Sequence, residues 1–140
     1  GVAGHIFSGV SRYEPSYVGR AIMPQNLSAV TAACMMMKRS VFEQVEGFDE
    51  KFQVAFNDVD LCMKTTYEGY QVVFTPDVEL YHYESKSRGV EDTSNKQSRF
   101  YQEVYRFESK WPEILEKGDP YYNKNLSLED GNCNLRDYMS

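Results

Sequence analysis

Two groups of polar residues in one stretch of this 140-residue chain have side chains that can do chemistry. Asp58 and Asp60 form an acidic pair at the expected start of a helix, where free backbone N–H groups stabilise a charged carboxylate. Such a carboxylate can act as a general base when a substrate displaces the surrounding water. The second group follows an expected strand and comprises His82, Glu84, Ser85 and Arg88. Imidazole, carboxylate and guanidinium groups together favour a metal or phosphate site.

A simpler interpretation of both groups stays open. Acidic residues in a first turn stabilise a helix by roughly 0.3–1 kcal/mol each without any catalytic role. From spacing alone this interpretation is preferred for Asp58 and Asp60. A lone histidine such as His82 is more often hydrogen-bonded than bound to a metal.

The acidic pair is expected to be positioned by a helix between Asn57 and Gly69. The Asn57 side chain can cap the free N–H groups, and Asp60 occupies the acidic position of a capping box. Gly69 is expected to end the helix. The buried face is expected to consist of Val59, Cys62, Met63 and Thr66. Asp58 then lies at the flank of this face.

The second polar group depends on strands expected between residues 70 and 83. Residues 70–75 are rich in β-branched and aromatic side chains, Pro76 interrupts them, and residues 78–83 alternate. This alternation places Val78, Leu80 and His82 on one face of the second strand. His82 is therefore expected where a strand leaves the core and meets a loop.

Regular elements are also expected before this stretch. Residues 1–29 show no sustained period and are expected to be irregular. The continuous apolar run of residues 30–37 predicts a strand that is covered on both faces. A short helix over residues 41–45 should follow, with Ser40 and Glu43 as its capping box and Gly47 as its end.

A longer helix is expected after the stretch that carries the two polar groups. It should run from Ser94 or Lys96 to Lys110, and Pro112 should end it. Its apolar stripe, which is typical of core packing, consists of Phe100, Val104, Phe107 and Trp111. Residues 113–140 are polar and are expected to be irregular.

Composition excludes several broad classes. The net charge of -6 disfavours a general nucleic-acid-binding role. The chain contains no apolar run near the length of about 18 residues that a membrane span requires. Its three cysteines lack metal-type spacing, which fits a reducing, cytoplasmic compartment. Eleven tyrosines are many for this length, and they can serve either as core residues or as a surface that stacks on sugars.

Residues 29–89 resemble the second half of a family 2 glycosyltransferase with the GT-A fold. The motifs that carry this resemblance are Asn57-Asp58-Val59-Asp60-Leu61, Gly69-Tyr70, Pro76 and His82, in that order. The likeness covers about residues 1–90, with further similarity near Asp119-Pro120-Tyr121-Tyr122, and points to bacterial polysaccharide or rhamnosyl transfer. It implies an α/β partial GT-A fold, a mixed sheet with flanking helices, over residues 1–92. A C-terminal helix and an irregular tail then occupy residues 93–140.

The resemblance also implies roles for individual residues. Asp58 would be the base of an inverting transfer from a nucleotide-diphosphate sugar to a hydroxyl of a glycan or other acceptor. His82 would face a divalent cation, Mg or Mn, and Arg88 would pair with a phosphate. The remaining substrate contacts would come from Asn57 and Asp60 on the helix, and from Thr31, Ala32 and Ala33, whose small side chains let a sugar approach the backbone. Asp60 would orient either the helix start or the acceptor.

One departure from the family pattern shapes the expected function. The family's first half carries a nucleotide-binding unit and an Asp-x-Asp metal motif, and nothing in residues 1–56 matches either. We therefore expect a carboxy-terminal fragment with an incomplete metal site and no transferase activity alone, located in the cytoplasm or at the inner face of the membrane. Uncovered strand edges would favour self-association. Two alternatives stay open: a non-catalytic glycan-binding module, and a metal-dependent hydrolase with Asp58, Asp60 and His82 as ligands.

Overall fold

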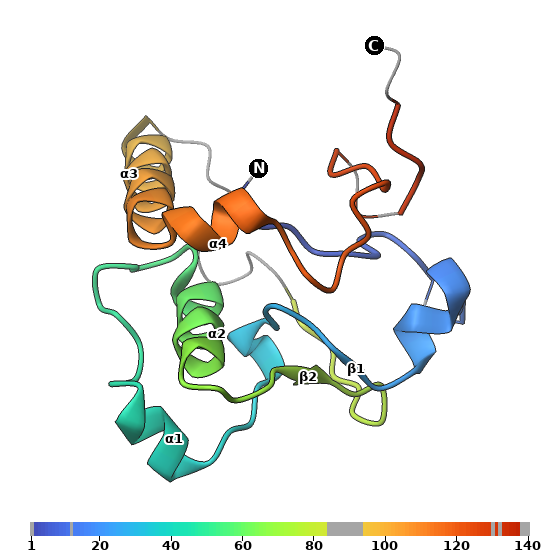
Figure 1. The fold of residues 1–140 in the computed structure, drawn as a ribbon, viewed down its shortest axis with the longest axis horizontal. Coiled ribbons are helices and arrows are strands. Elements are labelled where there is room, and N and C mark those ends of the chain that lie inside the picture. Colours follow the sequence, from blue (N-terminus) through green and yellow to red (C-terminus); the bar gives the residue numbers. More distant parts are fainter. Residues whose placement is uncertain (1, 12, 84–93, 130, 132, 138–140) are drawn as a thin grey trace.

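The computed structural model describes residues 2–11, 13–83, 94–129, 131 and 133–137. Within these ranges the chain is a mixture of helices and one small sheet, which agrees with the expected α/β class in its coarse form (Figure 1). The elements in chain order are η1 (Tyr17–Ile22), β1 (Gln25–Asn26), η2 (Ala32–Cys34), α1 (Arg39–Gln44), α2 (Asn57–Tyr67), β2 (Val73–Phe74), α3 (Ser94–Lys110) and α4 (Pro112–Lys117).

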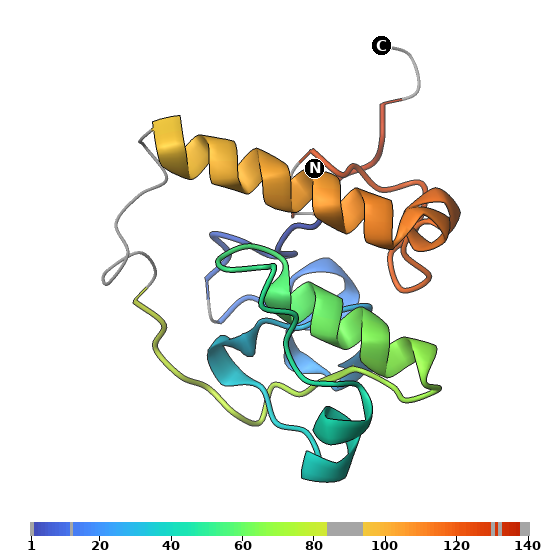
Figure 2. The ribbon, with the colours of Figure 1, turned by 90° about the vertical axis from the view of Figure 1, so that its left-hand side faces the viewer.

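The core lies between α2 and α3, which are neighbours in both views of the ribbon (Figures 1 and 2). Phe52, Met63 and Phe107 form its centre, and the Phe52 and Phe107 rings meet edge to face with their centroids 6.2 Å apart. On α2, Cys62 and Met63 are buried as expected. Thr66 is exposed instead, because the buried surface of α2 extends around Leu61 and Thr65 on the side that the sequence pattern assigned to solvent.

The ends of α2 and α3 follow local signals in the sequence. Gly69 adopts a φ of +85°, which an L side chain rarely does, and its N–H donates to the Thr66 carbonyl, so the expected helix end is confirmed. The helix α3 ends at Lys110, and Pro112 begins α4 at a position where a missing N–H costs nothing.

The expected caps of α1 and α2 are wrong. The capping residue of α2 is Phe56, in the left-handed region with a φ of +64°, and Asn57 is already the first helical residue. The helix α1 begins at Arg39 with Lys38 as its capping residue and no side-chain cap. The Glu43 carboxylate accepts from Arg39 on the same helix at 2.7 Å, so it does not serve a capping box.

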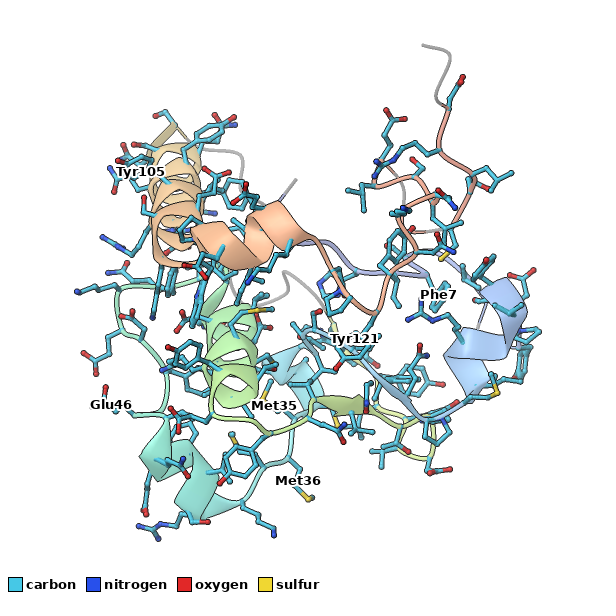
Figure 3. The ribbon with its side chains drawn as sticks, in the orientation of Figure 1. Phe7, Met35, Met36, Glu46, Tyr105 and Tyr121 are labelled. Carbon is cyan, nitrogen blue, oxygen red and sulfur yellow. The ribbon has the colours of Figure 1, made fainter. Side chains whose placement is uncertain are left out.

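The buried strand expected over residues 30–37 is also wrong. Thr31 caps the short 3-10 helix η2, because its hydroxyl accepts a hydrogen bond from the Ala33 N–H. Met36, labelled in Figure 3, is 98% exposed. A buried strand needs a partner on each edge for its backbone groups, and within the described ranges the one sheet consists of β1 and β2 alone.

The strands expected over residues 70–83 reduce to the two residues of β2. Val73 pairs with Asn26 and Phe74 pairs with Gln25 in an antiparallel register. Val78 and Leu80 are exposed and lie in no strand, so the expected strand over residues 78–83 is wrong. The alternating pattern can be satisfied only when one face packs on a core, and in the described residues the sheet contains β1 and β2 but no strand from this segment.

The tail is more ordered than its composition predicts. The helix α4 forms within it, and Leu126 and Cys133 are buried. Leu126 and Leu135 form an isolated antiparallel bridge, and the Ser28 hydroxyl donates to Asp119 at 2.7 Å. The hydrogen bond between Ser28 and Asp119 therefore connects the tail to the early part of the chain.

Among the helices that the structure describes, none combines the length and the apolar character that crossing a membrane requires.

Candidate functional site

Asp58 lies in the first turn of α2, and its carboxylate joins α2 to η2. One oxygen accepts the Val59 N–H at 2.9 Å, and the other accepts the Ala32 N–H at 3.1 Å. These two N–H groups orient the carboxylate. The side chain is half-buried, so it is both held in place and accessible to a reactant.

The structure brings Asp58 together with the predicted sugar-pocket residues Thr31, Ala32 and Ala33, although 26 residues separate Asp58 from Ala32. All three are exposed. The residue before this segment, Val30, contacts α2, because its carbonyl lies 3.7 Å from the Cys62 thiol. Burial raises the pKa of this thiol, so it stays protonated and can donate. The arrangement is an open surface of small residues beside a carboxylate.

Asn57 is half-buried beside the predicted base. Its side-chain oxygen accepts the Asp58 N–H at 2.8 Å. The amide therefore fixes the backbone of the residue that we regard as the base, while its predicted contact with substrate stays a prediction.

Asp60 has no exposed surface. One carboxylate oxygen accepts from the Trp111 indole N–H at 2.9 Å and from the Lys110 ammonium at 2.7 Å. The other oxygen has no hydrogen-bond partner among the described residues, and the Lys64 ammonium lies 3.8 Å from it. These contacts hold the first turn of α2 in place, and both roles predicted for Asp60 stay predictions.

Lys110 also contacts Asp49, at 3.0 Å, and so connects two carboxylates. Burial lowers the pKa of Lys110, but its hydrogen bonds to Asp60 and Asp49 outweigh burial, so the pKa rises. Burial raises the pKa of Asp49, but the hydrogen bond from Lys110 contributes to the opposite effect, so the pKa falls. At neutral pH both groups are therefore charged.

Glu103 is a buried carboxylate that the sequence did not single out. It is 2% exposed and accepts the backbone N–H groups of Gln53 at 3.0 Å, Val54 at 3.3 Å and Ala55 at 2.7 Å. The available signal was a charged residue on the stripe that contains Phe100 and Phe107. A carboxylate at that position must find donors in the core.

The residues predicted to face a metal or a phosphate, His82 and Arg88, are described only in part. His82 is exposed in an irregular segment after β2. Arg88, with Glu84 and Ser85, lies outside the described residues. In the described part of the chain, no three side chains of the His, Cys, Asp and Glu types gather into a metal-binding group.

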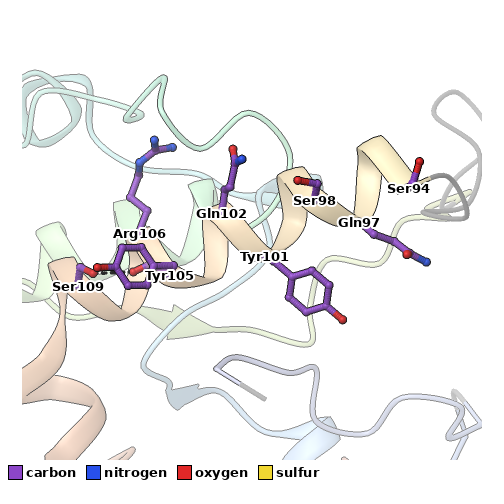
Figure 4. A pocket seen from close by; sticks show the side chains of 8 residues that line it. All are labelled: Ser94, Gln97, Ser98, Tyr101, Gln102, Tyr105, Arg106 and Ser109. Atoms are coloured by element: carbon purple, nitrogen blue, oxygen red, sulfur yellow. Dashed lines mark hydrogen bonds between the residues drawn. The ribbon is translucent and has the colours of Figure 1, made fainter.

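Two hollows lie away from Asp58. One, of about 840 Å³, runs along the outer face of α3 and is lined by Tyr101, Gln102, Tyr105 and Arg106 among others (Figure 4). This face is opposite to the one that carries Glu103 and Phe107. The other hollow, of about 240 Å³, lies between residues 7–21 and the end of β2.

Comparison with known proteins identifies bacterial relatives. The chain is 47% identical over 130 residues to the uncharacterized protein y4gI of Sinorhizobium fredii, covering 92% of this chain and 14% of that protein. It is 38% identical over 118 residues to the O-antigen biosynthesis protein RfbC of Myxococcus xanthus, covering 84% of this chain and 9% of that protein. It is 33% identical over 66 residues to the N-acetylglucosaminyl-diphospho-decaprenol L-rhamnosyltransferase of Mycobacterium tuberculosis, covering 47% of this chain and 22% of that protein.

These matches support the resemblance that the motifs indicated. The chain is similar to parts of proteins named for O-antigen biosynthesis and for L-rhamnosyl transfer, which fits a fragment of a rhamnosyltransferase-like enzyme. It spans between 9% and 22% of the length of these curated relatives. No protein-family model matches the chain, and no solved structure matches it.

Proposed function

We propose that this chain is the acceptor-side part of an inverting glycosyltransferase with Asp58 as its general base. The observation that carries the proposal is the Asp58 carboxylate, held by the Ala32 and Val59 N–H groups at the edge of an exposed segment of small residues. The names of the relatives, O-antigen biosynthesis and rhamnosyl transfer, favour a polysaccharide acceptor and a deoxyhexose donor.

The proposed reaction uses Asp58 to take a proton from the attacking hydroxyl. The hydroxyl oxygen forms a bond to the anomeric carbon while the bond from that carbon to the diphosphate breaks. The proton passes to Asp58, and the nucleoside diphosphate leaves with the electron pair. A positioned base contributes typically 10²–10⁴-fold to such a step. Ala32 and Ala33 carry only methyl groups, so a sugar ring can approach the carboxylate closely.

A divalent cation, Mg or Mn, would neutralise the departing diphosphate in this reaction. His82 is the one side chain of the described segment that we assign to it, and Arg88 would contact a phosphate. A single imidazole does not make a cation site, which needs several oxygen or nitrogen ligands. The described residues therefore do not by themselves fit the cation, and the proposed site takes its other ligands from elsewhere in a longer polypeptide.

The longer polypeptide is part of the proposal, because each relative far exceeds the matched stretch in length. Its nucleotide-binding half would supply the donor site, so we propose that residues 1–140 alone do not turn over. We further propose that the enzyme works in the cytoplasm or at the inner face of the membrane, where nucleotide sugars are made.

The test compares this chain alone with the polypeptide in which the residues encoded upstream of Gly1 are restored. Each is supplied with nucleotide-diphosphate deoxyhexoses, a lipid-linked or soluble glycan acceptor, and Mg or Mn. Transfer by the longer form, its loss by about 10²–10⁴-fold in Asp58→Asn, and full transfer by Asp77→Asn are expected. Asp77 is exposed and lies in a turn after β2, so it is a matched control. Equal transfer by the Asp58→Asn variant would refute the assignment.

A glycan-binding function is the second candidate, and the outer face of α3 favours it. Tyr101 and Tyr105 are largely exposed along the hollow of Figure 4, and aromatic rings stack on sugar faces. Glycan-array binding that is independent of divalent metal and is lost in Tyr101→Ala would support it. The hydrolase alternative is disfavoured, because Trp111 and Lys110 already occupy one Asp60 oxygen in the core.

A further inference from the structure

The buried face of α3 contacts the segment that leads into α2. Phe100, Glu103, Phe107 and Trp111 recur at helical spacing along α3 and its end. Each contacts a residue between Gln53 and Asp60. Asp58 lies inside that segment. The helix α3 therefore contacts residues on both sides of the proposed base, but none of these contacts involves the Asp58 carboxylate.

The first contact is made by the Glu103 carboxylate. Its two oxygens accept three successive backbone N–H groups, those of Gln53, Val54 and Ala55. Charge-assisted hydrogen bonds of this kind are about twice as strong as neutral ones. Since no strand of the described residues pairs with these N–H groups, Glu103 determines the path of the chain immediately before Phe56.

The second contact holds Phe56 in an unfavourable backbone conformation. Its φ of +64° is uncommon for a bulky residue and persists only where the surroundings enforce it. The Phe56 ring stacks on Phe107 with centroids 5.1 Å apart and lies 5.9 Å from the Phe100 ring. This turn sets the direction in which α2 begins.

The third contact holds the other side of Asp58. The Trp111 indole N–H donates to Asp60 at 2.9 Å, and the Asp60 carboxylate is fully enclosed. Phe56 and Asp60 are therefore both bound to α3, and Asp58 lies midway between them. With both neighbours held, the backbone at Asp58 is held as well, and from this position its carboxylate accepts the Ala32 N–H.

We propose that Glu103 and Trp111 are positioning residues that aim the Asp58 carboxylate at the segment from Thr31 to Ala33. The catalytic meaning of this rests on the proposed role of Asp58 as base. The contact between Asp58 and the Ala32 N–H can be measured without any transferase assay. A failure of the positioning proposal can therefore be distinguished from a failure of the proposed function. By this proposal α3 contributes to the site by holding the residues on both sides of Asp58.

The test uses backbone amide resonances of the 140-residue chain at neutral pH. Asp58→Ala provides the reference position and exchange rate of the Ala32 amide when no carboxylate faces it. In Glu103→Gln and in Trp111→Phe we expect the Ala32 resonance to move most of the way to that reference. Its hydrogen exchange should rise by about tenfold, as for the loss of a charge-assisted hydrogen bond. Amides inside α2, from Leu61 to Met63, should keep their positions.

Glu108→Gln is the matched control, because Glu108 is an exposed carboxylate on the same helix. It should leave the Ala32 resonance unchanged. An unchanged Ala32 amide in both test variants would overturn the proposal, as would a change that appears equally throughout α2. If Glu103→Gln does not fold, Trp111→Phe decides alone, because it removes one donor and keeps an aromatic ring. If Ala32 responds while Asp58→Asn keeps full transfer activity in the longer polypeptide, the geometry stands and the catalytic role fails.

Discussion

The indole N–H of Trp111 donates a hydrogen bond of 2.9 Å to the fully buried carboxylate of Asp60. Fifty-one residues separate the two, and the bond ties the corner between α3 and α4 to the first turn of α2. Lys110 adds an ion pair to the same carboxylate oxygen at 2.7 Å. A buried charge with two donors on one oxygen is sensitive to the loss of either donor.

Replacing Trp111 by Phe should lower the free energy of unfolding by about 1–3 kcal/mol, because a buried acceptor loses its donor. Urea denaturation followed by far-ultraviolet circular dichroism measures the change. Tyr105→Phe is the control, since Tyr105 is exposed on the outer face of α3. It should change stability by less than about 0.5 kcal/mol. Equal stability of the two variants would show that the bond contributes nothing.

Replacing Asp49 by Asn should make the free energy of unfolding depend less steeply on pH in the acid range. Burial raises the pKa of Asp49, but the hydrogen bond from Lys110 helps to hold that pKa in the folded chain below its ordinary value of 3.8. The carboxylate therefore contributes stability above that value, and the contribution is lost as pH falls through the lower, folded pKa. Urea midpoints between neutral pH and acid should decline less steeply in Asp49→Asn than in the unmodified chain. A slope in Asp49→Asn equal to that of the unmodified chain would contradict the linkage.

Replacing Gly69 by Ala should destabilise the chain by about 1–2 kcal/mol, because a left-handed conformation is unfavourable for an L residue. Beyond the two chain neighbours of Gly69, no heavy atom of the described residues lies within 4 Å of the added methyl group, so backbone strain accounts for the effect. Gly4→Ala is the matched control, because Gly4 also has open space but no positive φ. Thermal unfolding of both variants distinguishes them. A Gly69→Ala variant as stable as Gly4→Ala would argue against the helix end described above.

Self-association of the isolated chain is expected at the surface around the residue 30–37 run and the segment after β2. Met36 is 98% exposed and Leu80 is 70% exposed, and apolar groups of this size favour burial in a contact. Light scattering during gel filtration should show a mass that grows with concentration. The double variant Met36→Lys and Leu80→Lys should reduce this growth, whereas Ser98→Lys on the polar face of α3 should not. A strictly monomeric chain would refute the expectation.

The sequence alone determined the two long helices and the positions of their C-terminal ends. The signals are local: a period of 3.6 residues, Gly69 after the last turn of α2, and Pro112 after α3. A helix satisfies its hydrogen bonds within one segment, so neighbouring residues suffice to predict it. The same motifs led to Asp58 and to the glycosyltransferase resemblance, which the relatives support.

The tertiary structure decided what depends on distant partners. The expected strands over residues 30–37 and 78–83 did not form, because a strand is stabilised only by a neighbour that sequence cannot supply locally. The contact of Asp58 with Ala32, the enclosure of Asp60 and the three N–H groups on Glu103 each join residues 26 to 51 positions apart. Buried carboxylates take whatever donors the packed chain brings to them, and packing is a property of the whole fold.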